Sequence, residues 1–334
     1  MTHNNAESLT FESYSTCFMF ALDIIWNPLE GIDLGFFKIH FYSLSYVIAF
    51  VLGWYIIKPI FKREGISFEK LDPLFMYTVI GCLFGARVGH YLFYEREVLF
   101  TDPLHVLLPF RLSPFEWTGF MGMASHGAAI GIIIAMFFYS RKHLQKHMFW
   151  ILDRIVVPTA IGGTFVRLGN LMNSEIGGKV SSDPWAFKFV RDTSDDNVRA
   201  ALSATGITDK DTAIDALVNQ PQFASLLNSI PSKHPTQIYE ALCYVGVFLV
   251  LYFVYWKTEK RNKLGYILGL FFVLLFTVRF FIEFVKEKQT DTDSYELFGS
   301  VFNTGQLLSV PFILIGLFLM FSPEGLFKNP EKKA

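Results

Sequence analysis

Seven long apolar stretches divide the chain, and most of them lack the regularly spaced polar side chains that mark a soluble amphipathic helix. A transmembrane helix needs about 20 mostly apolar residues. None of the stretches alternates apolar and polar residues as a membrane β-strand does. We therefore expect an all-α polytopic membrane protein with seven transmembrane helices, at about 41–61, 73–94, 119–139, 148–173, 236–256, 264–286 and 303–322.

Lysine and arginine are spread unevenly over the segments between these stretches. The short segments 57–72, 140–147, 257–263 and 323–334 hold 14 of them, whereas the much longer segments on the other side hold 10. Short loops rich in lysine and arginine stay in the cytoplasm. This distribution predicts that the first group is cytoplasmic, with the N-terminus outside and the C-terminus inside.

The arrangement divides the chain into an extracytoplasmic N-terminal segment, a seven-helix domain, an insertion between the fourth and fifth spans, and a cytoplasmic tail. Their ranges are 1–40, 41–322, 179–233 and 323–334. The N-terminal segment has no basic start and Asp23 interrupts its apolar part, so we expect an amphipathic surface segment and not a cleavable signal. The extracytoplasmic insertion is expected to be a small helical unit, with a helix cap at Thr208 and Asp211 three residues later.

Composition and charge narrow the function classes. Apolar residues make up 52% of the 334 residues and charged residues 18%, below the roughly 25% of a typical soluble domain. The formal net charge of −1 removes the electrostatic case for nucleic-acid binding. The three cysteines cannot build a disulfide framework, and no Cys or His cluster has the spacing of a zinc site.

Polar side chains inside the predicted spans carry the functional information, because a charge at mid-helix costs about 2.5–3.5 kcal/mol. Successive spans run in opposite directions, which brings residues far apart in the sequence to one depth in the outer half of the bilayer. These residues are Tyr42, Arg87, His126, Arg167, Glu240 and Arg279. The three arginines exceed what the acids there would neutralise. Such an excess of buried positive charge favours an anionic ligand.

Several of the polar residues also have a purely structural interpretation. Asp153 and Arg154, at the inner end of the fourth span, are expected to be interfacial anchors or a structural pair. Arg279 and Glu283 lie on one helix face and can neutralise each other. His126 can be a packing histidine, and the glycine- and alanine-rich run around it can be a close helix-packing surface.

Two polar motifs flank the insertion. The fourth stretch ends in VRLGNLMNSEIGG, in which three polar residues share a helical face before a glutamate and two glycines interrupt the helix. The fifth stretch begins with HPTQIYE, where Pro235 suits the first turn of a helix. The residues that share a face are Arg167, Asn170 and Asn173 in the first motif, and Gln237 and Glu240 in the second.

Together with the other spans, these motifs resemble the prolipoprotein diacylglyceryl transferase family of the bacterial inner (plasma) membrane, over about residues 30–322 apart from the insertion. The family pattern Arg-x-Gly-Asn-x-x-Asn-x-Glu-x-x-Gly is matched at 167–178, His-Pro-x-Gln-x-Tyr-Glu at 234–240, and Arg-Phe-x-x-Glu-Phe at 279–284. GMASHG resembles the family's histidine motif, and GARVGH its second-span motif. The insertion is longer than the family pattern leads us to expect. Small departures fall at Ala124, Ser125, Ala128 and Val166.

The resemblance implies transfer of the diacylglyceryl group from phosphatidylglycerol, a membrane lipid, to the lipobox cysteine thiol beside the signal peptide of a prolipoprotein. A thioether forms and glycerol phosphate leaves, with no cofactor or metal. His126 is implied as the base for the thiol, and Arg167 and Arg279 as the phosphate-binding residues. Whether His126 takes the proton, or only donates a hydrogen bond beside an arginine-linked network that takes it, is left open. The residues implied to position the lipid or to support the arginines are Tyr42, Arg87, Asn170, Glu175, Gly178, His234, Gln237, Glu240 and Glu283.

Three other classes compete with an enzyme of this family. A transporter is compatible with buried charges in seven spans, but the repeated halves common in transporters are not detectable. A retinal protein needs a buried lysine, which the seventh stretch lacks. An intramembrane serine protease is disfavoured because Ser125 lacks a G-x-S-G setting. Lipid-dependent modification of a cysteine peptide would separate the enzyme from the transporter.

Overall fold

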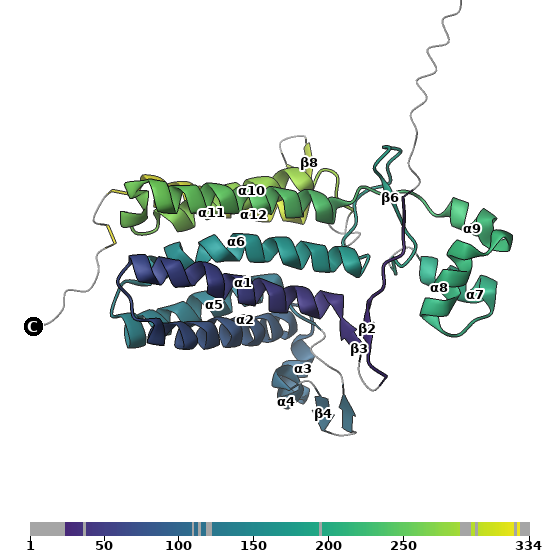
Figure 1. Cartoon of the computed structure of the whole chain (residues 1–334), viewed down its shortest axis with the longest axis horizontal. Coiled ribbons are helices and arrows are strands. Elements are labelled where there is room, and N and C mark those ends of the chain that lie inside the picture. Colours follow the sequence, from purple (N-terminus) through teal and green to yellow (C-terminus); the bar gives the residue numbers. More distant parts are fainter. Residues whose placement is uncertain are drawn as a thin grey trace, which may run out of the picture.

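A computed structural model shows a bundle of long, nearly parallel helices with a smaller helical unit beyond one end (Figure 1). It describes residues 24–35, 38–108, 110–112, 115–117, 122–193, 196–287, 295–297, 300–323 and 326–327. Most of the tail predicted at 323–334 therefore lies outside the described residues, as do residues 1–23 of the N-terminal segment.

A helix occupies each of the seven predicted spans. They are α1 (Phe41–Arg63), α2 (Leu71–Phe93), α5 (Ser125–Tyr139), α6 (Met148–Met172), α10 (Thr236–Lys257), α11 (Tyr266–Ile282) and α12 (Thr304–Phe321). Five of them, α1, α2, α6, α10 and α12, are long and apolar enough to cross a membrane. The other two are shorter: α11 has 17 residues and α5 has 15. The helical membrane architecture is confirmed, and the number of seven spans stays a prediction.

Short elements connect the long helices. Among the described residues, β1 pairs with β6 in parallel, whereas β2–β3, β4–β5 and β7–β8 are antiparallel pairs. The strands are β1 (Ile24–Trp26), β2 (Gly31–Asp33), β3 (Lys38–His40), β4 (Phe110–Leu112), β5 (Phe115–Trp117), β6 (Phe187–Phe189), β7 (Tyr295–Leu297) and β8 (Ser300–Phe302). The short helices are α3 (Arg96–Thr101), α4 (Pro103–Leu107), α7 (Asn197–Thr205), α8 (Lys210–Asn219) and α9 (Ala224–Ser229), and the helical turns are η1 (Phe68–Lys70), η2 (Ser140–Leu144), η3 (Pro221–Phe223) and η4 (Glu259–Asn262).

Helix α6 runs through the middle of the bundle. Figure 1 shows α10, α11 and α12 on one side of it and α1, α2 and α5 on the other. It packs against α1, α10, α11 and α5. Two thirds of the residues in its most apolar stretch are buried, a far larger share than in the other long helices. Other helices therefore cover most of α6, and polar residues on its covered faces, such as Asn170 at 4% exposed, are enclosed by protein.

The apolar core occupies the end of the bundle where the short connections lie. Phe61 of α1, Tyr139 of α5, Ile151 of α6 and Tyr255 of α10 are fully buried there. The other half of α6 instead carries Arg167 and the asparagines of its polar motif. Tight packing at one end therefore fixes the helices, and the polar residues are gathered toward the other end.

The charges at the packed end are structural. Asp153 is fully buried, and its carboxylate accepts hydrogen bonds from the backbone N–H groups of Gly265 and Leu268, each at 2.8 Å, at the start of α11. Arg154 donates to Glu64 at 2.9 Å. Arg154 Nη1 also lies 3.9 Å from Asp153 Oδ2. Neither side chain reaches the surface, so the structural pair is confirmed and the interfacial anchors are wrong. Asp153 supplies the partner that the first N–H groups of a helix otherwise lack.

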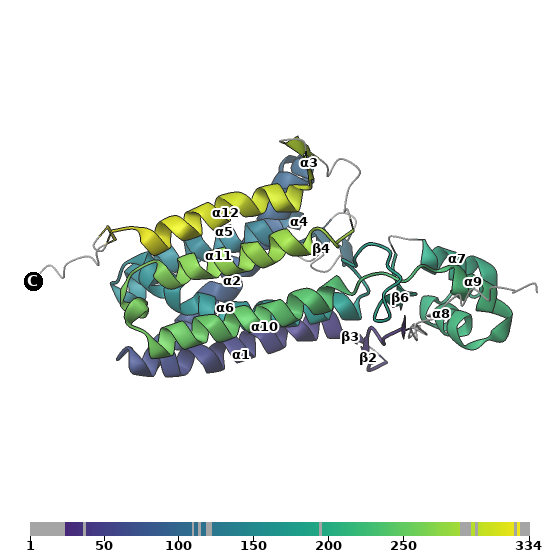
Figure 2. The ribbon, with the colours of Figure 1, turned by 90° about the horizontal axis from the view of Figure 1, so that it is seen from above.

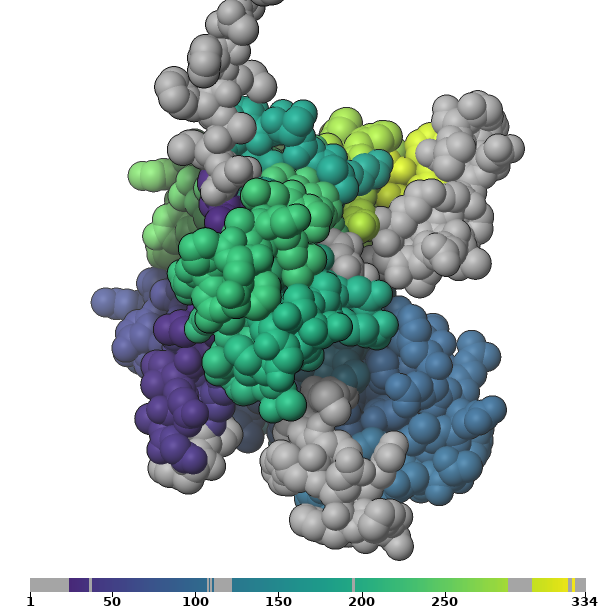
Figure 3. Space-filling view, turned by 90° about the vertical axis from the view of Figure 1, so that its right-hand side faces the viewer, coloured from purple at the N-terminus to yellow at the C-terminus, as the bar shows by residue number. Residues whose placement is uncertain are grey.

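The insertion folds as a helical unit with a small core of its own. Helices α7, α8 and α9 pack around the buried residues Ala201, Ile214 and Leu217, and the unit stands beyond the end of the bundle in the view of Figure 2. Figure 3 shows it over the middle of that end of the molecule. The predicted cap at Thr208 is one residue off: Asp209 caps α8, and its carboxylate accepts from the Thr212 N–H at 2.9 Å.

The segment before α1 ties this unit to the bundle. Strand β1, the described part of the predicted amphipathic stretch, pairs with β6 inside the insertion. Asn27 donates to Asp215 at 2.9 Å, and Lys210 donates to Glu30 at 2.6 Å. Asp211 accepts from Arg191 and from Lys38, the latter at 3.1 Å. The insertion is therefore held through the N-terminal segment to the start of α1.

Candidate functional site

An ion pair between α6 and α10 forms the centre of the candidate site. Arg167 Nε lies 2.7 Å from Glu240 Oε2, and their side chains are 14% and 1% exposed. Arg167 Nη1 lies 3.5 Å from Asn170 Oδ1, and the guanidinium carbon lies 6.0 Å from the centre of the Tyr244 ring. A buried guanidinium requires a compensating charge, and Glu240 supplies it at this position.

The turn after α6 holds a second polar group. Glu175 Oε1 accepts hydrogen bonds from Asn170 Nδ2 at 3.0 Å and from Asn173 Nδ2 at 3.3 Å. Its backbone oxygen accepts from Gln237 Nε2 at 2.8 Å. Ile176 has a φ of 62°, which is unfavourable for a β-branched residue and is most often found at functional sites. The turn is therefore held in its conformation by side chains from α6 and α10.

Gly178 explains why this turn can lie against the start of α10. A Cβ atom at Gly178 would lie 2.6 Å from His234 Cβ and 2.8 Å from Thr236 Cγ2. His234 itself points toward the insertion, with its Nδ1 3.3 Å from Tyr239 Oη and 3.5 Å from Asp183 Oδ2. The structure thus places Gly178 at a close backbone approach and His234 at the base of the insertion.

A second charged centre lies where α11 ends and α12 begins. Glu283 Oε1 is 4.0 Å from Arg279 Nε and 3.4 Å from Lys286 Nζ, and Glu283 Oε2 accepts from Asn303 Nδ2 at 3.0 Å. A Cβ atom at Gly305 would lie 2.5 Å from the Glu283 carboxyl carbon. The missing side chain at Gly305 therefore lets Glu283 lie against the N-terminal end of α12, where a negative charge is favoured.

The two centres interact electrostatically and form one charged cluster. Arg167 interacts with Glu283 as well as with Glu240, and Lys286 interacts with both arginines and both glutamates. The cluster consists of Arg167, Glu240, Arg279, Glu283 and Lys286. Its three cations and two carboxylates leave one positive charge in excess. The expected convergence of residues from the fourth, fifth and sixth spans is thus seen in the structure.

Sequence reasoning missed Lys286, which is only 6% exposed. The signal was present, because Lys286 follows Glu283 by three residues and Arg279 by seven, the spacing of one helix face. Tyr244 was missed as well, although it lies one turn after Glu240 on α10.

His126 lies in the first turn of α5 and interacts electrostatically with Arg279. The glycine-rich run around it is a close packing surface. A Cβ atom at Gly127 would lie 2.3 Å from the backbone oxygen of Gly85 on α2, and one at Gly131 would lie 2.1 Å from that of Gly81. The packing interpretation of the run therefore holds, and this packing fixes where α5 presents His126.

Arg87 has different neighbours from the other two arginines. It is 2% exposed, and its guanidinium donates hydrogen bonds to the backbone oxygens of His105 at 2.7 Å, Val106 at 3.2 Å and Leu108 at 3.2 Å. These carbonyls end α4, where helix carbonyls lack partners. Arg87 thus ties α2 to the segment that follows it.

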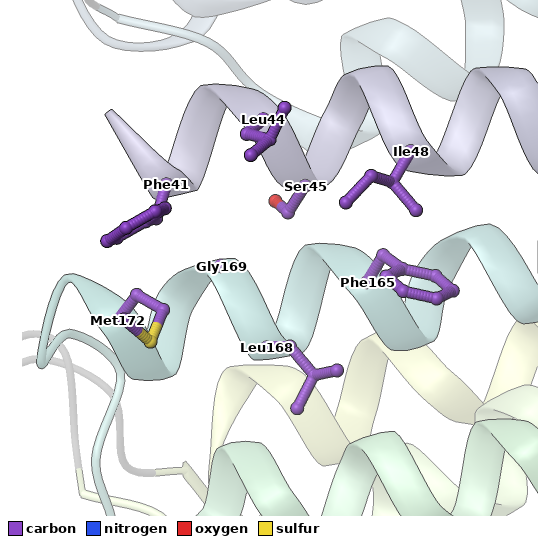
Figure 4. Close-up of a pocket in the computed structure, with 8 residues that line it drawn as sticks. All are labelled: Phe41, Leu44, Ser45, Ile48, Phe165, Leu168, Gly169 and Met172. Atoms are coloured by element: carbon purple, nitrogen blue, oxygen red, sulfur yellow. The ribbon is translucent and has the colours of Figure 1, made fainter. Parts of the chain in front are cut away.

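Tyr42 lies at the start of α1, and its ring would be 3.1 Å from a Cβ atom at Gly169. Gly169 lines an apolar groove of about 290 Å³ between α1 and α6 (Figure 4). Its Oη is 3.1 Å from Tyr46 Oη, and Tyr46 interacts electrostatically with Glu175. Gly169 faces Ser45 across the two helices, and a Cβ atom at Gly169 would lie 2.4 Å from Ser45 Oγ. Tyr42 therefore contacts Tyr46 one turn along α1 and packs close to Gly169 of α6.

Several polar atoms at the site are buried without a hydrogen-bond partner among the described residues. They include Ser174 Oγ, Gln237 Oε1 and Glu240 Oε1. Buried polar atoms are nearly always paired, and a bound ligand or water is one explanation for those that lack a partner. The described residues contain no group of three or more His, Cys, Asp or Glu side chains arranged to hold a metal ion. The groups on offer are guanidinium, ammonium, amide and carboxylate, which suit an anionic, hydrogen-bonding ligand.

The fold and the site define a multi-pass helical membrane protein with a cationic site enclosed among its helices. Comparison with known sequences specifies the class further. The family model for prolipoprotein diacylglyceryl transferase matches residues 30–322. The chain belongs to the prolipoprotein diacylglyceryl transferase family, as the sequence motifs predict, and it is a transferase.

Proteins named phosphatidylglycerol–prolipoprotein diacylglyceryl transferase from three bacteria illustrate the relationship. The Bacteroides fragilis protein is 36% identical over 304 residues, which cover 90% of this chain and 95% of the relative. The Tolumonas auensis protein is 34% identical, with 89% and 96% covered. The Porphyromonas gingivalis protein is 36% identical, with 85% and 89% covered. The similarity extends over nearly the whole length of each relative.

Proposed function

We propose that this transferase moves the diacylglyceryl group of phosphatidylglycerol to the lipobox cysteine thiol of prolipoproteins, the first step of lipoprotein maturation. The sulfur forms a bond to the glyceryl carbon that carries the phosphate. The bond from that carbon to the phosphate oxygen breaks, and glycerol phosphate leaves with the electron pair. The observation that carries the proposal is the cationic cluster between α6, α10 and α11, in a chain of this family.

Arg167 and Arg279 are the phosphate-binding groups of the proposal. The donor lipid is an anion at membrane depth, and negative charge grows on the phosphate oxygen as the carbon–oxygen bond breaks. Fixed guanidinium groups stabilise such charge most where water is excluded. Glu240 and Glu283 hold the two arginines in place through the contacts at 2.7 and 4.0 Å.

The remaining polar residues surround the lipid headgroup. Gln237 Oε1 and Glu240 Oε1 are acceptors without a partner, and the headgroup glycerol offers two hydroxyl donors. Glu175 and Asn170 keep the turn beside them in place through their 3.0 Å hydrogen bond. Tyr42 and Gly178 shape the neighbouring backbone and groove, whereas Arg87 and His234 act from the edges of the site.

The acceptor thiol must lose its proton to become a nucleophile. His126 is the candidate base of the proposal, because it interacts electrostatically with Arg279 and a histidine can take a proton near neutral pH. The alternative remains that His126 donates a hydrogen bond and the arginine-linked network takes the proton. The variant His126→Gln keeps a hydrogen-bonding group, and near-normal turnover by it would eliminate the base role.

The topology completes the proposal. We infer seven spans in the bacterial inner membrane, with the N-terminus and the insertion outside and the C-terminus in the cytoplasm. The distribution of lysine and arginine supports this orientation. The charged cluster then lies in the outer half of the bilayer, where the cysteine of an exported prolipoprotein would meet it beside its signal peptide.

The test uses the purified chain in phosphatidylglycerol vesicles with a synthetic lipobox peptide, and the lipidated peptide is measured by mass. Arg167→Ala and Arg279→Ala should each abolish lipidation while the protein still inserts. The matched control is Arg199→Ala, which removes an arginine that is 82% exposed on α7. Full activity of both site variants would overturn the assignment, and uptake of lipid without peptide modification would favour the transporter.

A further inference from the structure

We propose that Lys286 is a third phosphate-binding residue of the donor-lipid site. The inference rests on the proposed function, which identifies the ligand as a phosphate ester. Lys286 lies outside the Arg-Phe-x-x-Glu-Phe motif, and its side chain is buried with its Nζ 3.4 Å from Glu283 Oε1. It also interacts electrostatically with both arginines. It is the one cation of the charged cluster that lies outside the long helices, because α11 ends at Ile282.

The position of Lys286 is fixed on both sides along the backbone. Its main chain forms a bridge with Gly178 in the turn after α6. The preceding residue, Val285, accepts a hydrogen bond from Lys179 N–H at 2.8 Å, and the following residue, Glu287, donates to the Gly177 oxygen at 3.3 Å. A side chain on such a supported backbone is held for binding with little loss of freedom.

The insertion strengthens this support. Glu287 accepts from Lys233 Nζ at 2.7 Å, and Lys233, which is 2% exposed, also pairs with Asp192 at 3.2 Å. The acid beside Lys286 is thus already bound to another cation. Lys286 Nζ therefore faces the charged cluster and not its sequence neighbour.

Charge balance argues that Lys286 does more than neutralise Glu283. That carboxylate already accepts from Asn303 at 3.0 Å and lies against the start of α12. Arg279 is a further cation beside it, at 4.0 Å. A buried ammonium added to a carboxylate with these partners is costly unless an anion balances it. A phosphate ester held between Lys286 and the arginines supplies that anion.

The experiment compares Lys286→Met and Lys286→Arg with the wild type in the vesicle assay. Lys286→Met should raise the KM for phosphatidylglycerol about ten- to a hundredfold, the range for losing one hydrogen bond to a charged group. The Ki for glycerol 1-phosphate as a soluble inhibitor should rise by the same factor. Lys286→Arg keeps the charge and should restore both constants to within about threefold, since a phosphate is bound better by a cation of another shape than by a neutral group.

Lys179→Met is the matched control. It removes a lysine whose backbone pairs with the segment that holds Lys286. The Lys179 side chain, however, is exposed and donates a hydrogen bond to the Phe284 backbone oxygen. It should leave both constants unchanged. A neutral Lys286→Gln variant repeats the comparison with a side chain that can still donate a hydrogen bond, and it serves if the Met variant does not accumulate.

Unchanged KM and Ki in the neutral variants would overturn the role of Lys286. Equal loss in the neutral variants and in Lys286→Arg would also overturn it, because a structural requirement for lysine would then explain the result. A wild type that binds glycerol 1-phosphate through Lys286 but lipidates no peptide would overturn the proposed function and leave the phosphate site standing. Inhibition by glycerol 1-phosphate without an effect of Lys286→Met on the lipid KM would restrict the site to the soluble product and refute the donor-lipid role.

Discussion

The ion pair between Arg167 and Glu240 permits a quantitative prediction for the lipid-free protein. Glu240→Gln keeps the shape of the side chain and removes its charge, which leaves the guanidinium 2.7 Å away without its anion. Removing one partner of a buried pair costs about 3–5 kcal/mol. Because 14% of the Arg167 side chain still reaches solvent, we expect the lower end, about 3 kcal/mol.

The measurement is the thermal unfolding midpoint in detergent without lipid. At about 2 °C for each kcal/mol in a large domain, Glu240→Gln should lower Tm by about 6 °C. The double variant Arg167→Met/Glu240→Gln removes both charges. It should be more stable than the sum of the single effects predicts, with a coupling energy of about 2 kcal/mol.

Added lipid supplies a second readout. A phosphate bound at Arg167 replaces the missing carboxylate, so phosphatidylglycerol should raise the Tm of Glu240→Gln more than that of the wild type. Diacylglycerol, which has the chains but no phosphate, should not discriminate between them. A Glu240→Gln protein as stable as the wild type, or single effects that simply add, would refute the view that this pair is a compensated buried charge.

Two further predictions concern packing and pH. Gly131→Ala should destabilise the protein by about 1–3 kcal/mol and reduce lipidation, because its Cβ would lie 2.1 Å from a backbone oxygen of α2. The control is Gly246→Ala on α10, where the Cβ would meet open space. Equal unfolding midpoints of the two variants would contradict the packing argument. The hydrogen bond from Arg191 holds the pKa of the Asp211 carboxyl below its usual range, together with Lys38 and against the effect of burial. A carboxyl group whose pKa is lower in the folded state stabilises the fold at pH values above its pKa in the unfolded chain, near 4. This stabilisation is lost as the pH falls through the pKa of the folded state. Hydrogen exchange in α8 should therefore be slow at pH 7 and accelerate on acidification below about pH 4. The stabilising role of Asp211 would be excluded if exchange, after correction for the intrinsic rate, did not depend on pH. It would also be excluded if Asp211→Asn had the same pH profile of exchange as the wild type.

The long helices and the two arginine centres could be predicted because lipid restricts sequence strongly. Apolar runs reveal the spans, and a costly charge such as Arg167 or Glu240 within a run marks a position that needs a partner. Alternating helix direction is then enough to place such residues at one depth. The structure adds the distances, and it shows that Glu240 and Glu283 each lie beside an arginine.

Other features could not be derived because they depend on the packing of short segments. Arg87 shares its predicted depth with the other arginines, yet its guanidinium meets the carbonyls that end α4, a five-residue helix without a strong sequence pattern. The cap at Asp209 instead of Thr208 is a choice between two adjacent capping residues. Asp153 reaches the start of α11, more than 100 residues later, and nothing in the local sequence indicates that contact.

The charge of the cluster bears on catalysis as well as on binding. Its three cations and two carboxylates leave one positive charge, which matches the single negative charge of a phosphatidylglycerol phosphodiester. As the bond to the glyceryl carbon breaks, the phosphate becomes a monoester, whose second ionisation near pH 6 gives it up to two negative charges at pH 7. If the phosphate binds at the proposed residues Arg167, Arg279 and Lys286, its interaction with them grows stronger along the reaction than it is in the bound donor. Only interactions that strengthen toward the transition state accelerate the chemical step. The carboxylates Glu240 and Glu283 weaken the hold of the cations on the donor lipid, which preserves the difference in binding between donor and transition state. We therefore expect neutral substitutions at Glu240 or Glu283 to tighten glycerol phosphate binding in any variant that still folds, and to lower kcat with it.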